Sequence, residues 1–64
     1  MEDNPIYESY KRLEQIIVNS TIDADKFVNG NNSAGTRVRK AMQEVKKIAQ
    51  NIRTEVQEQK NQPV

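Results

Sequence analysis

Apolar residues recur at helical spacing along the first half of the chain. They follow steps of three, four and seven residues, which places them along one side of an α-helix: Ile6, Tyr10, Leu13, Ile17, Ala24 and Phe27. Asn4 followed by Pro5 is a start signal, because Asn caps free backbone N–H groups and Pro suits the first helical position. The pattern predicts a helix over about residues 5–28. Ser20 and Thr21 interrupt its apolar side, and the β-branched residues 16–18 lower helix propensity, so the middle of this helix admits a kink.

The second half carries the most regular apolar pattern in the sequence. Five residues follow alternating steps of three and four: Val38, Ala41, Val45, Ile48 and Ile52. Met42, Ala49 and Val56 widen this stripe, and the period is that of a heptad repeat. It predicts a helix over about residues 34–59, which spans about 39 Å at a rise of about 1.5 Å per residue. Residues 60–64 include Pro63, so we expect a frayed tail there.

Residues 29–33, Asn-Gly-Asn-Asn-Ser, separate the two patterns and predict a turn. Asn-Gly also favours a β-hairpin, but that structure needs alternating flanks, and the flanks here have helical spacing. We therefore expect an all-α fold, an antiparallel two-helix hairpin forming a single domain over residues 1–64. A lone hairpin leaves apolar area exposed, so we expect two copies to form a four-helix bundle. The most buried residues should include Leu13, Ile17, Val45, Ile48 and Ile52.

Composition supports an oligomer and argues against several classes of function. The 64 residues include no Cys and no His, which removes disulfides and the usual zinc ligand sets as supports for a small core. We expect no metal, no cofactor, no small-molecule substrate and no enzymatic activity, since general acid–base catalysis usually needs His or a buried carboxylate pair. The sequence has no apolar run long enough to span a membrane and no signal-type start, so we expect a cytoplasmic protein.

Charge is unevenly divided along the chain. Up to Ser33 there are three cations against six acids, a net charge of −3, whereas the remainder has seven cations against three acids, a net charge of +4. Four of these cations are seven residues apart, and Lys40 and Lys47 stand beside them in the sequence: Arg39, Lys46, Arg53 and Lys60. The stripe predicted from them covers about 31 Å of helix and could meet several phosphates, because duplex DNA carries one charge per about 1.7 Å. The alternative is a basic helix face that is merely solvated.

The turn itself offers a weaker site for an anion. Residues 30–37 superficially resemble a phosphate loop, but Thr36 and Arg37 stand where that loop has Lys and Ser or Thr, and a helical segment precedes it. One backbone phosphate can still dock at the start of the second helix, beside Arg37, Arg39 and Lys40. Among the aromatic residues, we expect Tyr10 and Phe27 to pack in the core, and the role of Tyr7 stays open.

One block of the sequence is similar to a known family. The run from Gly30 to Lys40, Gly-Asn-Asn-Ser-Ala-Gly-Thr-Arg-Val-Arg-Lys, followed by Glu44, Lys46-Lys47 and Arg53, resembles the bacterial linker-histone-like proteins. The likeness is best over about Phe27 to Glu55, and the long basic tail of larger members is missing. The resemblance implies a chromosome-associated protein that binds DNA with little sequence preference. It places that role on Arg37, Arg39, Lys40, Lys46, Lys47 and Arg53.

The leading hypothesis is therefore a small, nucleoid-associated, histone-like protein whose partner is the phosphate backbone of double-stranded DNA. The predicted contacts are the six residues named by the resemblance together with Lys60, and the protein is expected to form a homo-oligomer. The alternative hypothesis is a helical interaction or oligomerisation module with no nucleic-acid role.

Overall fold

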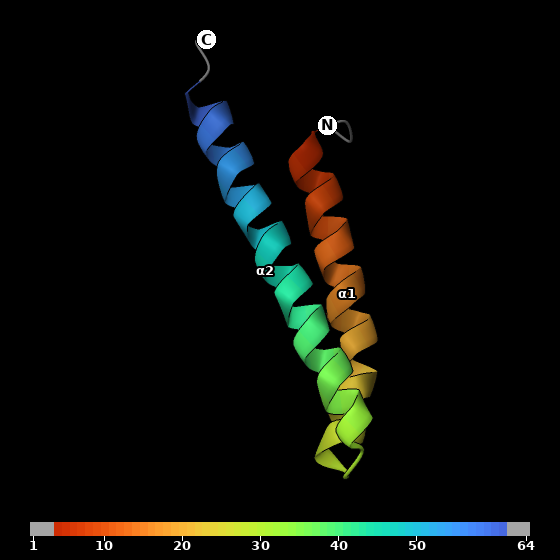
Figure 1. Ribbon diagram of the computed structural model, residues 1–64. Helices are drawn as coiled ribbons and strands as arrows, with labels where there is room; N and C mark the ends of the chain where they lie inside the picture. Colours follow the sequence, from red (N-terminus) through yellow and green to blue (C-terminus); the bar gives the residue numbers. More distant parts are fainter. Residues whose placement is uncertain (1–3, 62–64) are drawn as a thin grey trace.

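The computed structural model describes residues 4–61, which form two long α-helices and no strand. Helix α1 spans Pro5–Val28 and helix α2 spans Asn32–Lys60. The helices run antiparallel, side by side, and are joined by a short turn (Figure 1). The all-α hairpin predicted from the apolar pattern is confirmed.

Helix α1 begins with the Asn–Pro signal and continues without a break. The side-chain oxygen of Asn4 accepts a hydrogen bond from the backbone N–H of Ile6 at 3.0 Å, which satisfies one of the free donors at the start of the helix. The hydroxyls of Ser20 and Thr21 donate to the carbonyl oxygen of Ile17 at 3.2 and 2.9 Å. These two polar residues are thus accommodated within a continuous helix.

The turn is shorter than the five residues expected from the sequence. Gly30 has a φ of +106°, a conformation that L side chains rarely adopt, and its N–H donates to the carbonyl of Phe27 at 3.0 Å. The next residue, Asn31, caps α2 by accepting a hydrogen bond from the N–H of Ala34 at 3.1 Å. Because Asn31 is the cap, α2 begins at Asn32, two residues before the expected start at Ala34.

The far end of α2 extends one residue beyond its expected end at Gln59. Lys60 is helical, and Asn61 closes the helix by donating its N–H to the carbonyl of Gln57 at 3.1 Å. Residues 62–64 of the expected tail lie outside the described residues.

The helices bury little of their own surface. Among residues 4–61 only Ala34 and Ile48 are buried, at 0% and 6% exposure. Ala34 lies where the two helices leave the turn, and its small side chain permits their close approach. Of the other residues expected in the core, Leu13, Val45 and Ile52 are half-buried.

The side of α1 that contacts α2 differs from the predicted one. Along this side the half-buried residues are Ile6, Ser9, Leu13, Ile16, Ser20, Asp23 and Ala24. Tyr10, Ile17 and Phe27, which were predicted to be core residues, are 51%, 43% and 50% exposed, so that prediction is wrong for the single hairpin. The apolar residues of α1 occupy a wider part of its circumference than one neighbouring helix can cover. Helix α2 packs against one edge of this apolar surface, the edge that includes the small residues Ser9 and Ser20.

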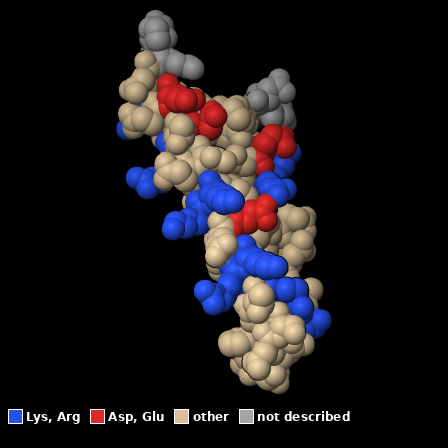
Figure 2. Space-filling model, viewed as in Figure 1, with Lys and Arg blue, Asp and Glu red and all other residues tan. Residues whose placement is uncertain are grey.

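The uncovered residues give the hairpin two unlike faces. Successive residues in an α-helix are rotated by about 100° around its axis. In two antiparallel helices, residues that are rotated in the same direction away from the contact between the helices lie on the same face of the pair. Some of the exposed apolar residues of both helices therefore share one face, which we call the apolar face: Tyr10, Ile17, Met42, Ala49 and Val56. Val18 and Ile22 are also exposed, but they lie on the outer side of α1 and not on this face. The opposite, charged face carries the ion pairs Arg12–Glu44 and Arg37–Asp23. Figure 2 views this charged face, with basic side chains along α2 and acidic ones midway and toward the end opposite the turn.

Three polar contacts tie the helices together along their length. Near the turn, Arg37 contacts Asp23 at 2.9 Å. Midway, the guanidinium of Arg12 contacts the carboxylate of Glu44. At the open end, the side-chain amides of Asn4 and Gln59 donate to each other at 3.1 and 3.0 Å. These contacts fix which residues of α1 and α2 lie at the same height.

Candidate nucleic-acid interface

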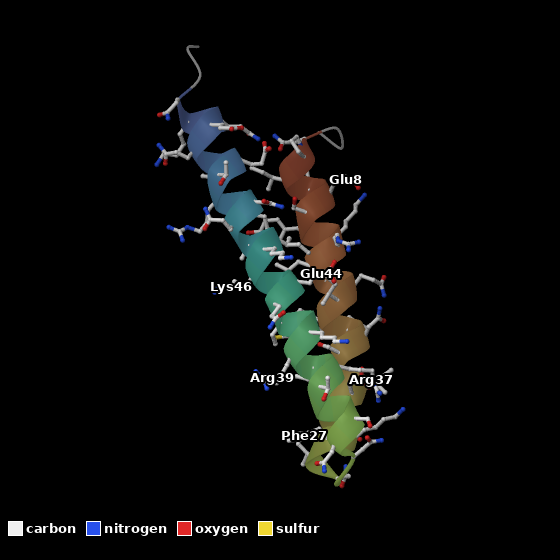
Figure 3. The ribbon with its side chains drawn as sticks, viewed as in Figure 1. Glu8, Phe27, Arg37, Arg39, Glu44 and Lys46 are labelled. Carbon is white, nitrogen blue, oxygen red and sulfur yellow. The ribbon has the colours of Figure 1, made fainter. Side chains whose placement is uncertain are left out.

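The predicted DNA contacts fall into two groups on α2 and one separate residue. Arg39, Lys46, Arg53 and Lys60 form what we call the outer basic row, which starts on the side of α2 away from α1. Figure 3 shows Arg39 and Lys46 pointing away from α1. Seven residues fall about 20° short of two full turns, so the row shifts gradually toward the apolar face as it approaches Lys60. Consecutive members are about 10.5 Å apart along the axis.

The second group, which we call the face pair, consists of Lys40 and Lys47. Both follow a member of the outer basic row by one residue and are rotated from it by about 100°, toward the charged face. Gln43 and Gln50 lie between the two groups on the helix surface. The sequence predicted one stripe, whereas the helix geometry separates its cations into two lines with amide side chains between them.

A shallow groove on the surface of α2 connects the two groups. Its lining consists of Gln43, Lys46, Lys47, Ala49, Gln50 and Arg53. Side-chain amides and cations are the groups with which proteins usually contact phosphate oxygens and sugars. The groove therefore combines positive charge with neutral hydrogen-bond donors. The two glutamines were not among the contacts predicted from the sequence, although their spacing of seven residues between the cations could have indicated them.

The charges of the two groups are exposed and available to an anion. All seven predicted contacts are exposed. Within residues 4–61, six of them make no ion pair: Arg39, Lys40, Lys46, Lys47, Arg53 and Lys60. Arg37 differs, because its guanidinium faces α1 and contacts Asp23 (Figure 3). An Arg37 that is already paired contributes less attraction for phosphate than the other six.

Acidic residues set the limits of this positive surface. Glu44 lies near the middle of α2 but contacts Arg12 of α1, which offsets its charge. Glu58 follows Lys47 by eleven residues, close to three full turns, and so lies in line with the face pair near the end of the helix. The positive surface is consequently strongest from Arg39 to Arg53.

The residues that carry the family resemblance at the turn have structural roles. Gly30 supplies the positive φ, Asn31 caps α2, and Ala34 fills the tight space between the helices. Gly35 lies beneath the ring of Phe27, where an added Cβ would come within 2.5 Å of that ring. Because Asn31 already accepts the N–H of Ala34 and Arg37 is paired with Asp23, fewer donors are free to bind a phosphate at the start of α2 than the sequence suggested.

No group of three or more His, Cys, Asp or Glu side chains that could hold a metal ion occurs in residues 4–61. Neither described helix is long and apolar enough to cross a membrane.

Comparison with known proteins places the chain in a family. The family model described as histone H1-like protein Hc1 matches residues 7–62, which include the turn, the outer basic row and the face pair. Searches of the curated proteins and of the solved structures found no match. The match covers most of the 64 residues, and the chain therefore belongs to the histone H1-like Hc1 family.

Proposed function

We propose that this protein binds double-stranded DNA with little sequence preference, as a histone-like component of the nucleoid. The observation that supports the proposal most directly is the set of six exposed cations on α2 that make no ion pair within residues 4–61. Membership of a histone H1-like family agrees with this function and with the expected lack of enzymatic activity.

The contacts are proposed to be with phosphates rather than with bases. The outer basic row and the face pair extend from Arg39 to Lys60, about 31 Å of helix. Lys and Arg neutralise phosphates and release counterions wherever the backbone runs, which gives affinity without sequence information. Gln43 and Gln50 can donate further hydrogen bonds to the same backbone.

The affinity of one chain should depend strongly on salt. The net charge of the whole chain is only +1, so attraction at long range is weak and depends on the local positive surface of α2. If three to five phosphates are neutralised per chain, log K falls against log salt concentration with a slope of about −3 to −4.

The test is a titration of a short DNA duplex at several salt concentrations, comparing the native chain with the double variant Lys40→Glu, Lys47→Glu. We expect the variant to flatten the slope by about 2 and to weaken binding at least about tenfold at 0.1 M salt. Both residues are exposed and Glu is a good helix former, so the fold should persist, which circular dichroism checks.

The matched control is the double variant Lys11→Glu, Lys26→Glu. It changes the net charge by the same amount, but its two exposed residues belong to α1. We expect this control to retain most of the DNA affinity. Equal losses in the two double variants would show that only net charge matters and would contradict an interface on α2.

The second candidate function is a helical interaction module with no nucleic-acid role. It is favoured by the apolar face, on which Tyr10, Ile17, Met42 and Val56 are between 40% and 51% exposed. This function predicts no measurable binding of the duplex even at low salt. If weak binding is seen instead, this function requires that the Lys40→Glu, Lys47→Glu variant leave it unchanged.

A further inference from the structure

The hairpin exposes more surface than a compact protein of its size. A compact monomer of this mass, 7.4 kDa, is expected to expose about 4,200 Å². The chain exposes 5361 Å². The excess of about 1,200 Å² is larger than the roughly 800 Å² that each partner buries in a stable protein–protein interface. The amount of uncovered surface is thus enough for one further copy of the chain.

The apolar face is where this surface can be covered. Its α1 half contains Tyr10 and Ile17, and its α2 half contains Met42, Ala49 and Val56, with the half-buried Val45 and Ile52 behind them. Large exposed side chains dominate this face, whereas only Ala34 and Ile48 are buried within residues 4–61. Covering it would give the hairpin the core that it lacks alone.

The two edges of the apolar face carry opposite charge. The edge formed by α1 includes Glu14 and Asp25, and no cation of Pro5–Val28 lies within it. The edge formed by α2 is the outer basic row, and no acid of Asn32–Lys60 lies within it. If a second copy packs on this face, the charges at the two edges will therefore attract or repel those of that copy, depending on its orientation.

The height of these charges follows from the contacts between the helices. The pair Arg12–Glu44 and the pair Arg37–Asp23 show which residues of α1 and α2 lie level. By this register Glu14 lies at the height of Lys46. On the single hairpin the two side chains are on opposite outer edges, so they cannot meet within one chain.

We propose that two copies pair through their apolar faces about a two-fold axis parallel to the helices, with both turns at the same end. Each α2 then packs antiparallel on α1 of the other copy, and Ile17 comes level with Met42 of that copy. At the edges, Lys46 faces Glu14 of the other copy, and Arg39 approaches its Asp25. All neighbouring helices of the resulting four-helix bundle are antiparallel.

The opposite orientation is disfavoured by charge. If the two turns were at opposite ends, α2 would lie on α2 of the other copy, and α1 on α1. The two outer basic rows would then be neighbours, and so would the acidic edges. Like charges face each other along both edges of that arrangement, which charge complementarity argues against.

A distance measurement on the intact chain distinguishes the two orientations. The sequence has no Cys, so Ser33→Cys introduces a single exposed labelling position in the first turn of α2. With a spin label there, pulsed electron paramagnetic resonance should give an inter-label distance below about 30 Å, since packed helices are about 8–10 Å apart. A distance close to the 53 Å length of the molecule would overturn the proposal, and so would the absence of any dipolar coupling between chains.

Charge exchange tests the edge contact itself, in sedimentation equilibrium without DNA. Glu14→Lys should weaken dimerisation about three- to tenfold, because each of two symmetric contacts changes from attraction to repulsion. The double variant Glu14→Lys, Lys46→Glu should restore it. The matched control Glu8→Lys alters an acid outside the apolar face and should leave dimerisation close to native. A monomeric native chain, or a double variant weaker than Glu14→Lys alone, would overturn the proposed orientation.

Discussion

At the scale of single residues, Gly30 has the clearest conformational role. Its φ of +106° is strained for any residue with a Cβ, although open space surrounds the position. Gly30→Ala should therefore lower the free energy of unfolding by about 1–2 kcal/mol, measured by urea denaturation at a fixed chain concentration. Gly35→Ala is the matched control: displacement of the half-exposed Phe27 ring is offset by better helix propensity, so its net effect should be smaller. An equal or smaller loss for Gly30→Ala would contradict this role.

At the scale of the elements, the start of α2 allows a test of which residue caps the helix, because three similar residues follow one another there. Asn31, Asn32 and Ser33 are all residue types that cap helices, and the structure assigns the cap to Asn31. Asn31→Ala should destabilise the hairpin by about 1 kcal/mol in thermal or urea unfolding. Asn32→Ala, one residue further on and exposed, should have much less effect. If the two variants were equally stable, the cap would not be at Asn31.

The sequence predicted which residues face the partner helix better for α2 than for α1. The regular three-and-four spacing in α2 correctly placed Ile48 in the core. In α1 the apolar arc is broad, and Ile16 and Ile17 differ by only one residue. The sequence therefore could not decide which of them faces α2, and Ile17 proved to be exposed.

The candidate site shows a similar division. The exposure of the outer basic row follows from its rotation away from the apolar stripe, and sequence spacing is enough to predict it. The pairing of Arg37 depends on Asp23, fourteen residues earlier on the other helix. Such a contact depends on the register between the helices, which the turn sets and which the pattern of either helix alone does not contain.

At the scale of the whole molecule, the proposed DNA-binding surface and the apolar face share a border. The outer basic row edges the apolar face and also belongs to the proposed DNA surface, whereas the face pair lies away from the apolar face. Salt should therefore weaken both DNA binding and the attraction between copies. Substitutions of Lys40 and Lys47 separate the two effects, because they change only the first.

The closeness of the helices at the turn has a consequence for how the molecule moves. The fully buried Ala34 lies at that end, and the helices diverge from there toward the opposite end (Figure 1). Local opening should then begin at the divergent end and proceed toward the turn, since regions with less packing open at lower free energy. Native-state amide hydrogen exchange should be fastest near Tyr7 and Val56 and slowest between Ala34 and Ile48. Uniform protection along both helices would mean that the hairpin opens in a single cooperative step instead.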